Sequence, residues 1–139
     1  MPDSEVRIRV LLVDDETVIR EGLRLLIDSW PTLEVIGEAD SPAEALMIMA
    51  GSKPNVIVCC HERNSGSFLE GLRAVVEAAD DIPVVVLASQ RYHQAATSAL
   101  TAGANCIISK KSTAADLREA LEYLHFAKTV QSPKVRSAS

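Results

Sequence analysis

The sequence predicts an α/β fold in which a parallel sheet is covered by helices on both faces. Two observations predict it. Short apolar runs rich in β-branched residues alternate five times with segments of helical spacing, and the joins between them are short. The chain has 139 residues, 47% of them hydrophobic and 24% charged, which is the size and balance of one globular domain with its own core.

Five apolar runs are the expected strands. The first contains Leu11, Leu12 and Val13, which are apolar in succession, as in a central parallel strand that is buried on both faces. The other runs are equally short, as strands beneath two layers of helices are. The expected strands are 6–13, 34–39, 56–60, 84–88 and 106–108.

Helical segments fill the intervals between these runs. In the first, Ile19, Leu23 and Leu26 are spaced to lie on one buried face. The second opens with a capping box formed by Ser41 and Glu44, a pattern that marks a helix start. The expected helices are 17–29, 42–51, 68–79, 92–102 and 112–126.

The compact domain is expected to cover residues 6–126. Its last helix is expected to open at Ser112 and to bury a stripe of leucines. Residues 127–139 carry three basic side chains, several serines and no acidic residue. This composition predicts a linker or disordered tail.

The element order leaves few topologies. Right-handed crossovers between parallel strands favour a flavodoxin-like, three-layer α/β/α sandwich, a (βα)₅ unit with the doubly wound strand order 2-1-3-4-5. The first and third strands are then neighbours at the point where the winding direction changes. Ligands of such sheets bind there, at the carboxyl ends of the strands.

Charge and hydropathy exclude several classes of function. The formal net charge of −5 argues against a broad nucleic-acid-binding surface on this domain. No apolar run approaches the roughly 20 residues that span a membrane, and the first residues lack a secretory signal pattern. An odd number of cysteines, three, favours a reducing compartment. We therefore expect a cytoplasmic protein that binds neither nucleic acid nor membrane through this domain.

Four polar or nucleophilic residues are expected to converge at the carboxyl edge of the sheet. Asp14 and Asp15 follow the first strand, Cys60 ends the third, and Lys110 follows the fifth. Paired carboxylates suit a hard cation such as Mg²⁺, and a lysine offsets the charge of a phosphoryl group. Each feature alone is typical of an ordinary helix start or a solvated lysine. The signal is their joint placement.

Several segments of the chain resemble the receiver domain of two-component response regulators, most closely the receivers that precede a helix-turn-helix output domain. This resemblance implies phosphorelay signal transduction, in which a histidine kinase supplies a phosphoryl group to an aspartate at the end of the third strand. The matching segments are 10–16, 53–58, 82–87, 102–112 and 116–121.

The departures from that family concern its phosphorylation site. Cys60 stands at the position of the phosphoacceptor aspartate, and Ala88 at the position of the switch Ser or Thr. Ile107 replaces the aromatic residue of the fifth strand. Asp14, Asp15 and Lys110 match. A thiol is too soft a ligand for Mg²⁺, and neighbouring carboxylates raise the pKa of a thiol.

The sequence therefore predicts a degenerate receiver that acts through protein–protein contacts without phosphorylation at the usual acceptor. We expect no enzymatic activity and no required cofactor, with only weak Mg²⁺ binding at Asp14 and Asp15. The resemblance implies a contact surface, for a protein partner or a second copy, around helices 92–102 and 112–126. Loss of the acceptor argues against a histidine kinase as the partner.

Other functions remain open at this point. Glu62 would serve as a relocated phosphoacceptor if its loop folded back, in a DNA-binding transcription regulator whose output domain lies outside this chain. Ser89 would replace the lost switch hydroxyl only if the fourth strand slipped by one residue. Cys60 is a candidate thiol sensor, although a small buried residue explains it as well. Cys60, His61 and the aspartate pair form a weaker candidate Zn²⁺ site.

Overall fold

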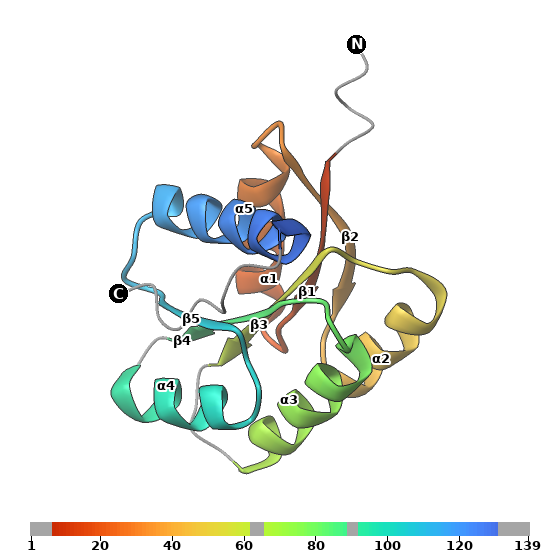
Figure 1. Cartoon of the computed structure of the whole chain (residues 1–139), viewed down its shortest axis with the longest axis vertical. Helices are drawn as coiled ribbons and strands as arrows, with labels where there is room; N and C mark the ends of the chain where they lie inside the picture. The colour runs from red at the N-terminus through yellow and green to blue at the C-terminus, as the bar shows by residue number, and fades with distance from the viewer. Residues whose placement is uncertain (1–6, 62–65, 89–91, 131–139) are drawn as a thin grey trace.

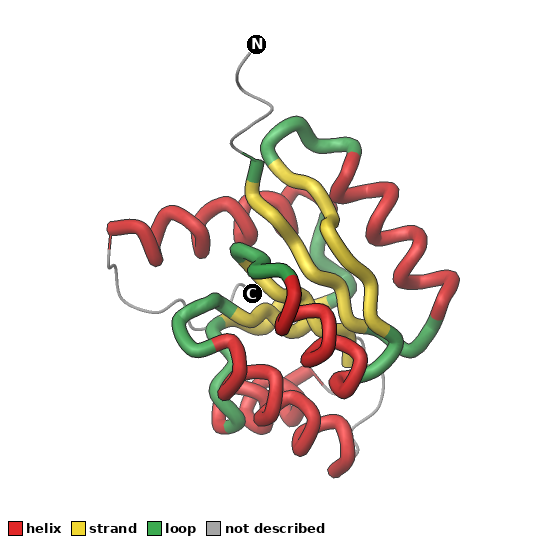
Figure 2. Tube along the Cα trace, turned by 90° about the vertical axis from the view of Figure 1, so that its right-hand side faces the viewer, coloured by secondary structure: helices red, strands yellow, loops and turns green. Residues whose placement is uncertain are grey.

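The protein is a five-stranded parallel sheet between two layers of helices, with strand order β2-β1-β3-β4-β5 (Figures 1 and 2). A computed structural model describes residues 7–61, 66–88 and 92–130. The predicted flavodoxin-like (βα)₅ architecture and strand order are confirmed. The strands are β1 (Ile8–Val13), β2 (Leu33–Ala39), β3 (Val56–His61), β4 (Val84–Ala88) and β5 (Cys106–Ser109). The helices are α1 (Thr17–Asp28), α2 (Pro42–Gly51), α3 (Gly66–Ala79), α4 (Tyr92–Thr101) and α5 (Ala114–Val130).

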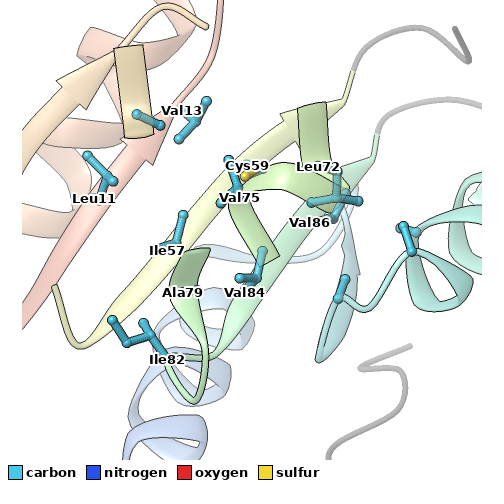
Figure 3. Packing of buried hydrophobic residues seen from close by; sticks show 14 of the residues in the cluster. Leu11, Val13, Ile57, Cys59, Leu72, Val75, Ala79, Ile82, Val84 and Val86 are labelled. Atoms are coloured by element: carbon cyan, nitrogen blue, oxygen red, sulfur yellow. The ribbon is translucent and has the colours of Figure 1, made fainter. Parts of the chain in front are cut away.

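Alternation along each strand divides the core into two clusters. Ile57 and Cys59 of β3 lie in the cluster beneath α2, α3 and α4, where they meet Leu72 and Val75 of α3 (Figure 3). The intervening residues, including Cys60, face the other cluster, beneath α1 and α5 (Figure 1). Since successive strand side chains point to opposite faces, two adjacent cysteines belong to different halves of the core.

An asparagine precedes two of the strands and extends the sheet hydrogen bonding by one residue. The backbone N–H of Asn55 donates to the Arg9 carbonyl at 2.7 Å, and its side-chain oxygen accepts from the Arg9 N–H at 2.9 Å. Asn105 makes the same pair of bonds with Val84, each at 2.9 Å. These two residues therefore fix where β3 and β5 begin.

The last helix differs from its predicted bounds at both ends. Thr113, and not Ser112, caps it, because the Thr113 hydroxyl accepts the Asp116 N–H at 3.1 Å. The helix then runs to Val130, so residues 127–130 are helical where a tail was expected. The stretch from Phe126 to Ser132 contains no proline or glycine, so nothing in the local sequence ends the helix at Phe126. The segment 131–139 lies outside the described residues.

Glycine is required after α4. Gly103 has φ +111°, and an added Cβ would lie 2.7 Å from Cγ1 of Val76. The turn after α4 therefore needs a backbone conformation that only glycine adopts without strain. Within the described residues, no helix combines the length and apolar character needed to cross a membrane.

Candidate functional site

Asp14 lies at the end of β1 and is held from three sides. Its N–H donates to the Ala39 carbonyl at 3.0 Å, its carbonyl accepts from Nη1 of Arg20 at 2.7 Å, and its Oδ1 accepts from the Glu16 N–H at 2.9 Å. The side chain is only 3% exposed. Its second oxygen, Oδ2, is buried with no hydrogen-bond partner in the described part of the chain.

Cys60 occupies the neighbouring position at the end of β3. Val13 pairs with Cys59 in the parallel ladder, so Asp14 and Cys60 follow side by side on the face beneath α1 and α5. Burial raises the pKa of the Cys60 thiol well above its ordinary value, the charge of Asp14 raises it further, and the charge of Lys110 offsets only part of this. The side chain is therefore a neutral thiol at neutral pH.

Lys110 comes to the site from the end of β5. Its N–H donates to the Ala88 carbonyl at 2.9 Å, which ties it to the end of β4. Its charge is close enough to lower the pKa of Cys60. The structure thus brings Asp14, Cys60 and Lys110 together, as the topology of the sheet led us to expect.

The remaining predicted site residues do not lie with Asp14, Cys60 and Lys110 in the described part of the chain. Ala88 pairs with His61 and Ser109, and its methyl group is buried in the cluster beneath α2, α3 and α4, on the opposite face from Cys60. Asp15 is exposed to solvent. Glu62 and Ser89 lie outside the described residues.

A metal ion finds few ligands here. Among residues 7–61, 66–88 and 92–130, no group of three His, Cys, Asp or Glu side chains could hold one. The side chain of His61, a candidate Zn²⁺ ligand, is outside the described part. Asp14 and Asp15 supply carboxylates of the kind that Mg²⁺ prefers, and the unpartnered Oδ2 of Asp14 suits a cation. The protonated thiol of Cys60 supplies no third hard ligand, so the donor set fits Mg²⁺ poorly.

Sequence patterning missed two features of this region. Arg20 joins α1 to the site, since it bonds Asp14 and also donates from Nε to Glu38 of β2 at 3.0 Å. A pocket of about 260 Å³ lies between α1 and α5, partly lined by residues of α1 that were expected to be plain core. The position of the charged Arg20 in α1 was a sequence signal for its link to the site. Hydrophobic periodicity gives no signal for the pocket, because core positions and pocket-lining positions are both apolar.

Comparison with known proteins agrees with this arrangement. Residues 10–122 match the family model described as "Response regulator receiver domain". The chain belongs to this family. The predicted resemblance to two-component receivers is thereby confirmed, and so is the role of this receiver as a signal-transduction module.

The chain spans only part of some of its relatives. It is 32% identical over 83% of the chain to the DNA-binding transcriptional activator DevR/DosR of Mycobacterium tuberculosis, of which it spans 53%. A solved LuxR-family response regulator from Aurantimonas sp. SI85-9A1 is 25% identical, with a TM-score of 0.78 over 94% of this chain and 89% of that one. The receiver thus covers little more than half of the first of these relatives.

The prediction that this chain has no enzymatic activity is wrong, because several relatives are named as enzymes. The receiver is 39% identical over 80% of its length to protein-glutamate methylesterase/protein-glutamine glutaminase 2 of Cereibacter sphaeroides. Several further relatives carry a name of the same kind. The receiver spans 31% of the first of them. A receiver fold does not determine the activity of the protein that carries it, so the motifs of this chain could not exclude an enzyme.

Proposed function

We propose that this receiver transmits a signal through protein–protein contacts without being phosphorylated at the usual acceptor position. The observation that supports the proposal best is Cys60, a buried and protonated thiol at the acceptor position, beside the Asp14 carboxylate. Phosphorylation there needs a nucleophile that also helps to hold Mg²⁺. A neutral thiol is a poor nucleophile and a poor Mg²⁺ ligand.

The end of β4 supports the same proposal. Ala88 has no hydroxyl to donate to a phosphoryl oxygen, and its methyl group is packed into the opposite half of the core. Lys110 still lies near Cys60, where its charge lowers the pKa of the thiol. We infer that the cluster now holds β1, β3 and β5 together and that any Mg²⁺ binding by Asp14 and Asp15 is weak.

The contact surface belongs to α4 and α5. Tyr123 and Phe126 of α5 are 49% and 62% exposed, so two aromatic side chains face outward on one helix. Exposed aromatic groups are common at protein interfaces. The surface would receive a protein partner or a second copy of the chain. A histidine kinase is not the partner we expect, because the acceptor is missing.

The wider setting is also a proposal. Since DevR/DosR is named a DNA-binding transcriptional activator, this receiver would serve in a transcription regulator whose DNA contacts are made elsewhere. Its three cysteines are free and buried, which suits a reducing compartment such as the cytoplasm.

Incubation with acetyl phosphate and Mg²⁺, followed by intact mass, tests the proposal. We expect no phosphoryl adduct on the wild-type chain. A stoichiometric adduct that hydroxylamine removes would overturn the proposal and indicate a relocated carboxylate acceptor. Loss of that adduct in Glu62→Gln would then assign it to Glu62, the alternative acceptor.

A further inference from the structure

A polar cluster joins the middle of α5 to the turn between α1 and β2. The Thr32 hydroxyl donates to Oε2 of Glu122 at 2.5 Å, and Nε of Arg118 donates to the same oxygen at 3.1 Å. The Arg118 guanidinium also lies over the Trp30 ring, 6.0 Å from its centroid. The Thr32 bond, and to a lesser degree Arg118, lower the pKa of the Glu122 carboxyl, so it accepts both bonds as an anion. We call these four residues the turn–α5 bridge.

The turn itself is anchored to the sheet. The Thr32 carbonyl accepts from the Ile8 N–H at the start of β1, at 2.8 Å. The Trp30 carbonyl accepts from the Leu33 N–H at the start of β2, at 3.3 Å. The Trp30 side chain packs against the core cluster beneath α1 and α5. The bridge therefore connects α5 to a segment that two strands hold in place.

The side of α5 that faces the sheet packs through apolar side chains. Leu117, Leu121 and Leu124 are buried in the same core cluster. Hydrophobic burial is not directional, so it holds the helix on the sheet without fixing its rotation about its own axis. Hydrogen bonds and the contact of a guanidinium with a ring both depend on geometry. The bridge is therefore suited to fix that rotation.

The bridge lies beside the proposed contact surface of α5. Tyr123 follows Glu122 directly, and Phe126 follows it by about one helical turn. Both aromatic side chains are exposed. Because they are attached to the same helix as Glu122, a rotation of α5 would move both rings together.

We propose that the turn–α5 bridge sets the orientation in which α5 presents Tyr123 and Phe126, which makes Thr32 and Glu122 positioning residues for the protein contact. This inference rests on the proposed contact surface of α5. The Arg118 and Glu122 side chains are partly exposed, and exposed ion pairs add little to stability. The contribution of the bridge is therefore to the geometry of the surface.

Amide exchange followed by NMR tests the bridge within the chain itself. Thr32→Val keeps the shape of the side chain but removes the hydroxyl. We expect the amides from Arg118 to Phe126 to exchange about fivefold faster in this variant, while those of β3 keep their rate. Thr32→Ser retains the hydroxyl and should exchange as the wild type does. Ser29→Ala is the matched control, because it removes a hydrogen bond to the Leu26 carbonyl at the end of α1 that does not reach α5.

Sedimentation velocity measures the consequence for the contact. Thr32→Val should weaken self-association about threefold or more, because α5 is less well ordered before binding, whereas Thr32→Ser and Ser29→Ala should not. Equal exchange of α5 in Thr32→Val and Ser29→Ala would overturn the proposal. So would unchanged association of Thr32→Val under conditions where Phe126→Arg weakens it. A monomeric wild type would instead contradict the homodimer, since the exchange measurement tests the bridge without association.

Discussion

At the scale of single residues, the site is decided by which side chain stands beside Asp14. A carboxylate at position 60 would share the buried edge with Asp14 and Lys110 as a charged cluster. The thiol that is present stays neutral because burial and the charge of Asp14 both oppose its ionisation. Burial affects the ionisation of the thiols outside the site as well, since the three cysteines are all buried.

Stability should fall at alkaline pH because of these thiols. Burial raises the pKa of Cys59 to about 12 and that of Cys106 to about 11, from 9.0. The unfolded chain loses these protons first as pH rises above 9.0, so the folded state binds more protons and the free energy of unfolding decreases with pH. The contribution is complete below this value and is lost as pH rises toward about 12.

Urea unfolding of the wild type and Cys59→Ala at about pH 8 and pH 10.5 measures this effect. The decrease for a fully buried thiol approaches about 1.4 kcal/mol per pH unit. The variant is less stable at the lower pH because it leaves a cavity, yet its decrease with pH should be smaller. An identical decrease in both proteins would show that Cys59 ionises in the folded state as readily as in the unfolded one.

Residue patterns predicted the members of the site better than their orientation. Asp14, Cys60 and Lys110 were expected together because parallel strands end at one edge, and the structure brings them together. Ala88 was named only as the switch position, and its side chain lies on the opposite face of the sheet from Cys60. Matching a family motif gives the position of a residue, whereas alternation along the strand decides which half of the core its side chain enters.

At the scale of elements, two helical glycines have opposite roles. Gly22 lies in the middle of α1, and a Cβ added there meets no atom of the described chain within 4 Å. Gly71 lies in α3, where an added Cβ would overlap the ring of Pro42 at the start of α2. The close contact of α2 and α3 therefore depends on glycine at one position only.

Gly22→Ala should stabilise the receiver by up to about 1 kcal/mol, because alanine favours the helix and nothing opposes its methyl group. Gly71→Ala should destabilise it by about 1–3 kcal/mol through overpacking against Pro42. Urea unfolding of the two variants beside the wild type gives both values. A loss of stability in Gly22→Ala would mean that a segment outside the described residues packs on this face of α1.

Element ends were the part of the fold that the sequence predicted least well. Ser112 and Thr113 are both good capping residues, and only the hydrogen bond from Asp116 distinguishes them. The described part of α5 continues past Phe126 to Val130, and no sequence signal distinguished residues 127–130 from the tail that was expected. The capping of α2 was predicted at Ser41 and is confirmed by the Glu44 N–H, which donates to Oγ at 3.1 Å. The Glu44 side chain instead accepts from Asp40, one residue before the cap.

At the scale of the whole molecule, alternating strands and helices determine the architecture, so the three layers and the strand order could be predicted. The pocket between α1 and α5 could not, because it depends on how closely two helices approach over the sheet. The exposed aromatic side chains of α5, Tyr123 and Phe126, form the surface that we propose a partner covers.

Association through α5 should depend on Phe126. Phe126→Arg places a charge on the proposed surface and should weaken self-association in sedimentation velocity by about tenfold or more. Leu25→Arg alters an exposed apolar side chain on α1 and should leave association unchanged. A wild-type chain that stays monomeric at every concentration excludes the homodimer and leaves another protein as the partner of this surface.

The central claim is that Cys60 prevents phosphorylation at an otherwise recognisable receiver site. Intact mass after identical incubation of the wild type and Cys60→Asp with acetyl phosphate and Mg²⁺ tests it most directly. We predict no adduct on the wild type and one phosphoryl group on Cys60→Asp, where Asp14, Asp15 and Lys110 regain their missing carboxylate partner. A phosphoryl group on the wild type, or none on the correctly folded variant, would contradict the claim.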